Sequence, residues 1–465
     1  MRLNLTDNNH GQPDAGTFHR KDVAALFPIA DKTIAQLCRE NDNLLIFPYS
    51  IETSDDKIGD SAVLNILNTS NPEVVKISTD NVMGFIGVDN LQVKIKSRFD
   101  IGRDDYLLHY MLQKVLSFNL FDLSHNNEHE DVFDFIMFMF PYFLKKALRQ
   151  GIYREYQNFK HNDANVKGTI DLGRHIARNT PFAGNIAYTT REYSHDNSVT
   201  QLIRHTIEFM KTKKYGMSVL NIDNETKDNV QLVVENTPSY DKKERSYIVS
   251  KNLRHKKHPY YTEYQPLQCL CLQILRMDEV KYGESDDEIC GILFDGAWLW
   301  EEYVNTILRN YGFKHPENKR HKGGIYLFEG YSGVRYPDFY NDDMVLDAKY
   351  KRLGSYKSVA ENDRNDIHQV ITYMNNLKVE KGGFVSPLEN CQTTIPTSRL
   401  KNSSATLSIF GIEICQEALS YADFCGRMKK KEQDYIFRSI PVQYSGAAVS
   451  SRKGWKGLFL MSVSP

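Results

Sequence analysis

The spacing of hydrophobic and polar residues first becomes regular in the stretch LQVKIKSRFD. Val93 and Ile95 fall on one face of it and cationic residues, among them Arg98, on the other, so the stretch predicts a half-buried strand. Residues 105–118 instead show the spacing of an amphipathic helix. The region 1–125 is therefore expected to mix helix and strand.

The pattern over residues 126–285 is mostly helical. Residues 130–156 predict one long amphipathic helix with a kink at Pro141, because a proline inside a helix removes a hydrogen bond and clashes one turn back. Residues 199–212 predict a second helix, and VKGTIDL between the two predicts a turn and a short strand. The polar stretch 277–288 is the best candidate for a linker, so a domain boundary is expected there.

The last part of the chain mixes short strands with helices, which is typical of an α/β domain. The expected elements are a helix at 295–310, strands near 323–329, 334–340 and 344–350, a helix at 363–377, and strands at 382–388 and 408–414. They define a C-terminal domain over 286–440, followed by a weakly specified tail, 441–465. The predicted fold class is multi-domain α/β (α+β), with a C-terminal mixed sheet flanked by helices.

The composition of the chain mainly excludes certain classes of protein. The chain has 465 residues, enough for two or three domains, with 58 lysines and arginines against 59 aspartates and glutamates. A formal charge of -1 excludes a global nucleic-acid-binding character, so any affinity for DNA must come from local patches. The seven cysteines are an odd number scattered among apolar residues, which fits reduced core thiols better than a disulfide framework.

Targeting signals are lacking. The start of the sequence has no apolar segment of a secretory signal. The most apolar run, residues 135–144, is far shorter than the roughly 20 residues of a membrane-spanning helix. We therefore expect a cytoplasmic protein with no membrane association.

Charged residues interrupt the apolar pattern in RYPDFYNDDMVLDAKYKRL, residues 335–353. Asp347 and Lys349 share one face of a strand because alternate side chains point the same way. Asp338 can lie beside Asp347 if Asn341 to Asp343 form the turn between two strands. Two adjacent carboxylates repel each other and are commonly held by a cation, most often Mg²⁺ when every ligand is oxygen. An ordinary hairpin with a solvated polar face remains the alternative.

Two flanking helices carry further candidates. In DGAWLWEEYVNTILRN, Glu301 shares a face with the apolar stripe, whereas Glu302 falls on the polar face as a surface acid. A carboxylate beside an apolar stripe is costly unless a cation or hydrogen bonds receive it. In NDIHQVITYMNNL, a polar row of three residues has helical spacing, which is also what a solvated helix face looks like: Asp366, Gln369 and Tyr373.

The order of these elements resembles the PD-(D/E)xK nuclease fold, with YPD and DAK as the two halves of its signature. Several segments narrow the resemblance to the McrC family, the nuclease subunits of McrBC-type restriction systems, and to LlaJI-type restriction subunits. They are FDGAWLWEEYV, RYPDF, DAKYKRL, DIHQVITYM and GGFVSPLE, with VKIKSRFD, GIYREYQ, VKGTIDL and REYSHDNSVTQLIRHTIEF upstream, and they cover most of residues 90–440.

The resemblance implies a Mg²⁺-dependent DNA endonuclease of a modification-dependent restriction system. Asp338, Asp347, the carbonyl of Ala348 and Glu301 would hold the metal, and Lys349 would orient or deprotonate the attacking water. Lys351, on the same face, is a rival for that role. Gln369 and Tyr373 would position the water or the scissile phosphate.

Double-stranded DNA would be held by local positive charge, because phosphate contacts carry most of the affinity. Two basic clusters are candidates, although charge runs are usually solvated faces. They are Lys251, Arg254, Lys256 and Lys257 in the middle domain, and Lys319, Arg320 and Lys322 just before the charged hairpin.

The resemblance also implies a partner. The sequence has no G-x-x-x-x-G-K-[ST] motif, so this chain is not expected to hydrolyse nucleotides. A McrB-like AAA+ hexamer, a GTPase or ATPase, would bind the N-terminal region, residues 1–125, and be stimulated by it. Two alternatives stay open: a non-catalytic activator of that motor, and a stand-alone repair or recombination nuclease.

Overall fold

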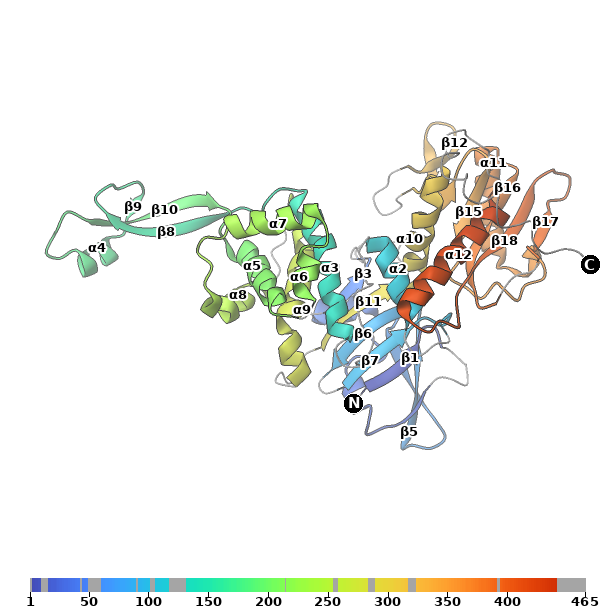
Figure 1. Ribbon diagram of the computed structural model, residues 1–465, viewed down its shortest axis with the longest axis horizontal. Helices are drawn as coiled ribbons and strands as arrows, with labels where there is room; N and C mark the ends of the chain where they lie inside the picture. Colours follow the sequence, from blue (N-terminus) through green and yellow to red (C-terminus); the bar gives the residue numbers. More distant parts are fainter. Residues whose placement is uncertain are drawn as a thin grey trace, which may run out of the picture.

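The computed structural model describes residues 2–9, 16–41, 44–48, 60–88, 91–100, 105–116, 131–213, 215–253, 258–282, 289–316, 323–390 and 394–440. The elements fall into an N-terminal pair of sheets, a helical region with a projecting arm, and a C-terminal mixed sheet (Figure 1).

The N-terminal region is built on a five-stranded sheet of order β1-β7-β6-β11-β3. Its strands are Arg2–Thr6, Leu91–Lys96, Val82–Val88, Ile289–Asp295 and Leu44–Phe47 in that order. A smaller sheet of order β2-β5-β4 lies below it in Figure 1, with strands Thr17–His19, Val74–Thr79 and Leu64–Asn68. The 3-10 turn η1 (Ala24–Leu26) and helix α1 (Ile34–Glu40) complete this region.

The middle region is mostly helical, as expected. Its helices are α2 (Tyr106–Leu116), α3 (Asp131–Leu148), α5 (Ser198–Lys211), α6 (Gly216–Leu220), α7 (Asn224–Glu235), the turn η3 (Lys242–Glu244), α8 (Arg245–Asn252) and α9 (Tyr264–Tyr282). Buried aromatic and aliphatic side chains join these helices to α10 and α12 of the C-terminal region in one continuous core.

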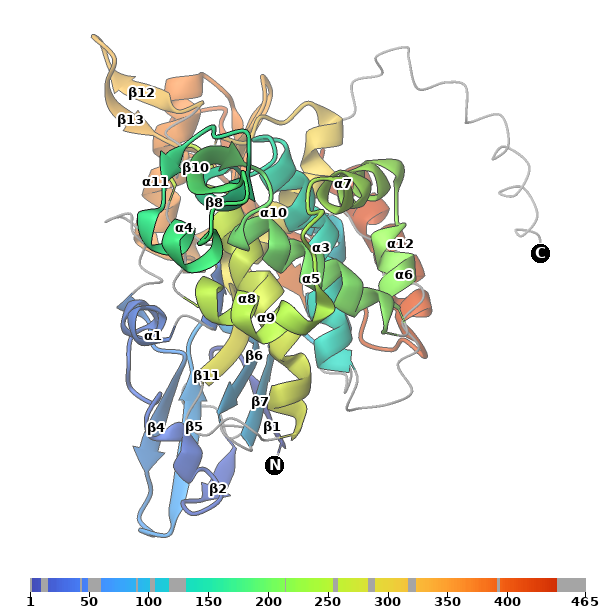
Figure 2. The same cartoon turned by 90° about the vertical axis from the view of Figure 1, so that its left-hand side faces the viewer.

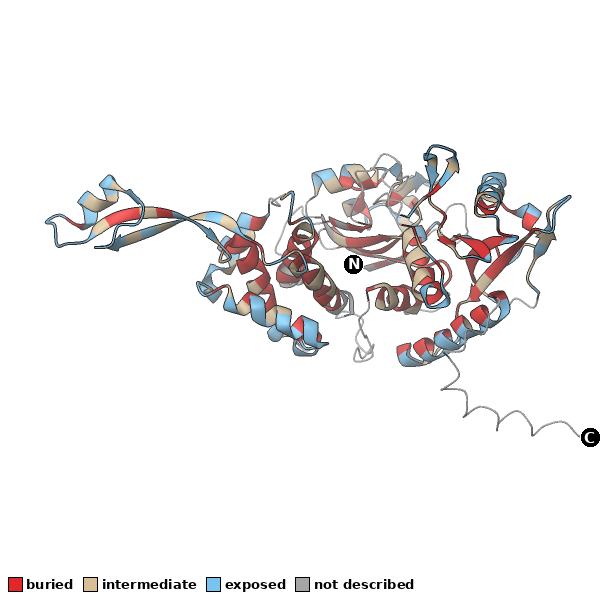
Figure 3. Ribbon diagram, turned by 90° about the horizontal axis from the view of Figure 1, so that it is seen from above, coloured by how far each residue is buried: buried red, intermediate tan, exposed pale blue. Residues whose placement is uncertain are grey.

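A long two-stranded arm leaves this helical region and was not predicted. Strands β8 (Glu155–Asp163) and β10 (Ile186–Ser194) pair antiparallel along their whole length, and β9 (Thr169–Ile170) and α4 (Leu172–Arg178) form the tip. Figures 1 and 3 show the arm projecting from the body, and Figure 3 shows exposed positions along most of it. Figure 2 looks along the arm toward the body.

The C-terminal region holds a sheet of order β14-β15-β16-β18-β17, whose strands are Phe339–Tyr340, Met344–Ala348, Lys381–Leu388, Thr406–Glu413 and Thr397–Arg399. The pairs β15–β16 and β16–β18 are parallel, and the two edge pairs are antiparallel. A separate hairpin, β12 (Ile325–Phe328) with β13 (Ser332–Arg335), precedes it. The helical elements are α10 (Gly296–Leu308), η4 (Arg309–Tyr311), η6 (Val359–Glu361), α11 (Arg364–Leu377) and α12 (Tyr421–Ser439).

Three sequence predictions need correction. The long helix expected over 130–156 ends at Leu148, because the chain turns at Gly151, whose φ of +90° suits glycine, and enters β8. The first half of the expected linker, residues 277–282, continues α9, which runs to Tyr282, and residues 283–288 lie outside the described residues. The strand that opens the expected domain 286–440, β11, pairs with β6 and β3, so it belongs to the N-terminal sheet. The strand expected over 334–340 is divided into β13 and β14, which belong to different sheets, and the other predicted strands and helices of the C-terminal domain are present within a few residues.

Two further findings concern the bulk properties. The five cysteines that the structure describes are free thiols, and four of them are buried, as expected of core residues: Cys269, Cys271, Cys415 and Cys425. Within the described ranges, no helix is both long and apolar enough to cross a membrane. The tail 441–465 lies outside the described residues.

Candidate functional site

The predicted charged hairpin is formed by β14 and β15. Phe339 pairs with Leu346 and Tyr340 with Val345 in antiparallel register. The turn is held by Asn341, whose Oδ1 accepts hydrogen bonds from the backbone N–H groups of residues 343 and 344 at 3.0 and 2.9 Å. This asparagine turn is what brings the two predicted aspartates to the same end of the hairpin.

Asp338 and Asp347 lie side by side at that end. Asp338 Oδ2 accepts a hydrogen bond from the backbone N–H of Ala348 at 2.7 Å. Burial raises the pKa of Asp338 to about 7, and repulsion from Glu301 adds to it. Burial likewise raises the pKa of Asp347 to about 7, with repulsion from Asp338 next in size. The three carboxyls therefore form one cluster that resists full ionisation.

Lys349 is one cation that this cluster meets within the chain. Its Nζ lies 2.8 Å from Asp347 Oδ2 and 3.2 Å from Asp366 Oδ1 on α11. Burial alone would lower the pKa of Lys349, but the attraction of Asp347, together with that of Asp338 and Asp366, raises that pKa above its ordinary value. The rival, Lys351, is exposed and lies 2.8 Å from Asp366 Oδ2. Only Lys349 is thus paired with an acid of the hairpin, as its spacing predicted.

Backbone contacts fix the position of Lys349. Its own N–H donates to the carbonyl of Val385 on β16 at 2.9 Å, which extends the β15–β16 pairing by one residue. The indole N–H of Trp300 on α10 donates to the same carbonyl at 3.0 Å. Since Trp300 is fully buried, α10 and the sheet are locked together at the site.

Glu301 and Glu302 both face the site, which corrects the prediction that Glu302 is an ordinary surface acid. Their side chains are 34% and 31% exposed, and each lies 3.8 Å from Nε2 of His315. Burial raises the pKa of Glu301 to about 7 despite the attraction of His315. Burial also opposes the charge on His315, but its contacts with Glu302 and with the carbonyl of Asp338 raise its pKa to about 9.

His315 was not among the site residues predicted from the sequence. Its Nδ1–H donates to the carbonyl of Asp338 at 2.7 Å, and its ring stacks on Phe339 with 5.0 Å between centroids. The residue therefore ties the start of β14 to the acidic face of α10. No local pattern singles it out, because its partners come from α10 and β14 and not from its own segment.

Helix α11 brings its polar row to the same place. Gln369 Nε2 donates to the hydroxyl of Tyr373 at 2.9 Å. Gln369 is exposed, whereas Tyr373 is buried, and electrostatic interaction with Asp338 and Asp347 shows that its hydroxyl lies near both. The row thus faces the cluster with Asp366 bound to Lys349 and Gln369 at the rim.

The donor set suits a hard divalent cation. Carboxylates of Asp338, Asp347 and Glu301 with the carbonyl of Ala348 are all oxygen ligands, the kind that Mg²⁺ prefers, and the mutual repulsion of the carboxyls is relieved by a cation. Within the described ranges, no three His, Cys, Asp or Glu side chains converge on one point as they stand. A bound ion would therefore require rotation of these carboxylates, one of which now pairs with Lys349.

A second, fully buried charge cluster adjoins the site. The guanidinium of Arg98 bonds to the carboxylate of Asp7, to Asn81 Oδ1 at 2.9 Å and to the carbonyl of Tyr350, the residue after Lys349. The Tyr350 hydroxyl is 2.6 Å from Ser97 Oγ. The alternation predicted that Arg98 lies on the solvated face of its strand, but Arg98 is buried and joins the N-terminal sheet to the charged hairpin.

Most of the predicted DNA-binding lysines and arginines lie outside the described residues: Arg254, Lys256, Lys257, Lys319, Arg320 and Lys322. Lys251 is exposed on α8, where its Nζ lies 4.3 Å from the centre of the Tyr247 ring. Figure 1 shows α8 and α11 in opposite halves of the molecule, so the structure does not bring Lys251 to the hairpin.

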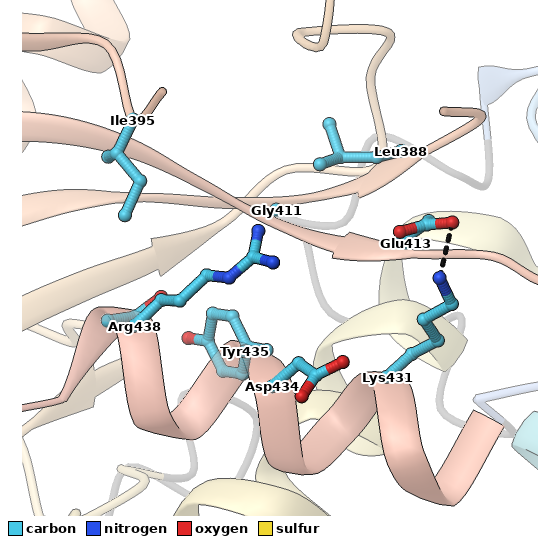
Figure 4. A pocket seen from close by; sticks show the side chains of 9 residues that line it. Leu388, Ile395, Gly411, Glu413, Lys431, Asp434, Tyr435 and Arg438 are labelled. Atoms are coloured by element: carbon cyan, nitrogen blue, oxygen red, sulfur yellow. Dashed lines mark ion pairs between the residues drawn. The ribbon is translucent and has the colours of Figure 1, made fainter. Parts of the chain in front are cut away.

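A cavity of about 70 Å³ lies elsewhere, between α12 and the ends of β16 and β18 (Figure 4). Its charged lining includes Lys431, which is 2.6 Å from Glu413, so that these two charges neutralise each other. None of the predicted site residues lines it. The candidate site is the open face at β14, β15, α10 and α11.

Comparisons with known proteins agree with the sequence motifs. The profile of one protein family, McrBC 5-methylcytosine restriction system component, matches residues 77–387. No curated protein matches. One similar solved structure is described as a refined half-complex from a tetradecameric assembly of Thermococcus gammatolerans McrB AAA+ hexamers with bound McrC; it has 13% identity, covers 92% of this chain and 100% of that chain, and gives a TM-score of 0.46. Another, a cryo-EM structure of the Thermococcus gammatolerans McrBC complex, has 16% identity, 68% and 90% coverage and a TM-score of 0.30.

Proposed function

Since this chain belongs to the family of McrBC 5-methylcytosine restriction system components, we propose that it is the DNA-cleaving subunit of its restriction system, a PD-(D/E)xK endonuclease. The observation that carries the proposal is the cluster of Asp338, Asp347 and Lys349 on one hairpin, closed by acids of two helices. A structural hairpin gains nothing from repelling carboxyls, whereas hydrolysis of a phosphodiester needs acids and a cation at one point.

Asp338, Asp347, Glu301 and the carbonyl of Ala348 would hold Mg²⁺ in this proposal. When bound, the metal supplies charge neutralisation at the scissile phosphate and acidifies water. The raised pKa values of the three acids show that ionising all of them is costly without a nearby positive charge. A bound metal ion would supply that charge.

The chain's own side chains supply orientation. Lys349 sits between Asp347 and Asp366, with its ammonium fixed by both, and so can hold the attacking water beside the hairpin. Gln369, held by the Tyr373 hydroxyl and exposed at the rim, can donate its second N–H to water or to a phosphate oxygen. Tyr373 then acts as the support that keeps Gln369 in place.

This arrangement predicts a distinct effect for Asp366→Asn. The Asp366 carboxylate binds Lys349 and Lys351 at once. Its loss removes one of the two carboxylates that hold the Lys349 ammonium in place. We expect kcat for cleavage to fall by about 10- to 100-fold with KM for DNA unchanged, the size typical of a misplaced group. The control is Asp342→Asn, an exposed acid of the hairpin turn, and an equal loss in both variants would contradict the role.

The partner that we propose is a McrB-like AAA+ hexamer using GTP or ATP, as in the complexes described for Thermococcus gammatolerans. The arm offers a surface for it. Large apolar side chains are exposed at its tip: Leu172, Ile176 and Phe182, at 68%, 64% and 65%. Side chains of this kind on a projecting element usually mark a contact with another protein.

Replacing these three tip residues by serine is expected to abolish stimulation of the motor's nucleotide hydrolysis, because the apolar contact is lost. The arm pairs along its full length without them, so the fold should hold. Stimulation is measured as nucleotide turnover at increasing concentrations of this chain. Unchanged stimulation would contradict this role of the arm and would favour a contact through the N-terminal region, residues 1–125.

The proposed function is tested by cleavage of methylated and unmethylated plasmid DNA with Mg²⁺, with and without the AAA+ subunit and nucleotide. Cleavage that requires motor and nucleotide supports the motor-coupled nuclease. Cleavage by this chain alone would favour a stand-alone repair or recombination nuclease. Stimulation of the motor without any cleavage would favour a non-catalytic activator.

A further inference from the structure

The hairpin formed by β12 and β13, residues 325–335, carries an unusual surface. Tyr326 pairs with Val334 and Phe328 with Ser332, so these side chains alternate onto one face. Four large apolar side chains within nine residues are exposed: Tyr326 at 46%, Phe328 at 67%, Tyr331 at 82% and Val334 at 37%. Figure 2 shows the hairpin projecting from the body at the upper left. We call this face the aromatic hairpin.

The rings of the aromatic hairpin are held in place. Tyr331 packs edge-on against Tyr326 with 5.3 Å between centroids. The Phe328 ring lies across Gly333, where a Cβ atom would come within 2.6 Å of it. Gly333 also has a φ of +67°, a backbone conformation that suits glycine. Ordered, exposed rings bind a partner at a low entropic cost.

The aromatic hairpin is continuous with the proposed catalytic site on two sides. Its second strand ends at Arg335, three residues before Asp338. Its first strand is fixed to α11, because Asn376 Nδ2 donates to the carbonyl of Tyr326 at 2.7 Å. The charge of Arg335 acts on Tyr373, the support of Gln369, so this guanidinium lies near the site.

From these observations we infer that the aromatic hairpin binds the substrate DNA beside the scissile phosphate, with its rings stacked on bases or sugars. This inference rests on the proposed nuclease function. DNA fits the surface because Arg335, at the end of the hairpin, is an exposed cation. A second exposed cation, Lys314, lies at β14, where its backbone pairs with that of Tyr340. Aromatic rings stack on the π faces of bases or insert between adjacent base pairs, and nearby cations form ion pairs with the phosphates.

The test uses the double variant Phe328→Ser and Tyr331→Ser in the full chain. Affinity for a short duplex is measured by fluorescence anisotropy with Ca²⁺ in place of Mg²⁺, to limit cleavage, at several salt concentrations. Each stacking ring contributes about tenfold, so we expect a loss of roughly 100-fold in affinity with an unchanged salt slope. Arg335→Ala should instead make the slope shallower, by about one unit for one phosphate contact.

Phe437→Ser is the matched control, because Phe437 is 86% exposed on α12, away from the hairpin. Tyr331→Phe keeps the ring and should retain wild-type affinity. Equal affinity of wild type and double variant would overturn the inference. If the double variant instead lost motor stimulation or self-association while binding DNA normally, the surface would be a protein contact. If wild type neither bound nor cut DNA, the proposed function itself would fail, whatever the hairpin does.

Discussion

Asp347→Asn is expected to lower the cleavage rate by about 10³-fold, because it removes a carboxylate from the point where charge must be neutralised. The same change should preserve or increase stability. The folded-state pKa of Asp347, about 7, lies above its ordinary value of 3.8, so the ionised carboxylate opposes folding at pH 8. Neutral asparagine relieves that cost, and we expect a gain of about 0–2 kcal/mol even though the pairing with Lys349 is lost together with the charge.

Urea unfolding at several pH values checks this prediction alongside the cleavage assay. The gain in the free energy of unfolding should shrink as the pH falls from 8 toward 4, because the wild-type carboxyl then takes up its proton. Asp343→Asn, in the exposed turn of the same hairpin, should change neither quantity. Loss of cleavage together with a large loss of stability would show instead that Asp347 is a structural residue.

Arg98→Met is expected to have the largest effect on stability, a decrease of about 3–5 kcal/mol in the free energy of unfolding, since it leaves a buried acid without its partner. The side chains of Arg98 and Asp7 are 7% and 0% exposed. Burial raises the pKa of Asp7 to about 6 even with Arg98 present. Arg98 also binds the carbonyl of Tyr350, so cleavage should fall as the position after Lys349 loosens.

A double-mutant cycle with Asp7→Asn isolates the interaction energy between Arg98 and Asp7 from the contributions of their other contacts. The double variant should lose clearly less than the sum of the two single losses, because each single change leaves a buried group unpaired. Arg427→Met is the control: Arg427 forms an exposed ion pair with Asp423 at 2.9 Å, which should contribute little to the free energy of unfolding. Additive losses at Arg98 and Asp7 would contradict the proposed coupling.

The parts of the site that were predictable from sequence are local. The alternation that places Asp347 and Lys349 on one face, the asparagine turn and the polar row of α11 each lie within one or two elements. Their spacing in the chain nearly determines their spacing in space. The order of the elements was also predictable from the hydrophobic and polar pattern, and the structure has the same order.

What the sequence could not show depends on contacts between distant segments. The alternation placed Arg98 on a solvated face because it describes one strand alone, whereas the partners of Arg98 lie just after β1, just before β6 and just after β15. β11 reads as the start of a new domain, yet its hydrogen-bonding partners lie in the N-terminal sheet. The arm was missed because its strands are polar along most of their length and so lack an apolar face.

The most direct test of the nuclease assignment compares Lys349→Met with Lys351→Met in single-turnover cleavage of plasmid DNA, with Mg²⁺, the AAA+ subunit and nucleotide present. The two changes remove the same ammonium two residues apart, and both lysines pair with Asp366, but only Lys349 pairs with Asp347. The assignment predicts that Lys349→Met loses cleavage while still stimulating nucleotide hydrolysis, and that Lys351→Met cuts within a few-fold of wild type. Wild-type cleavage by Lys349→Met would contradict it.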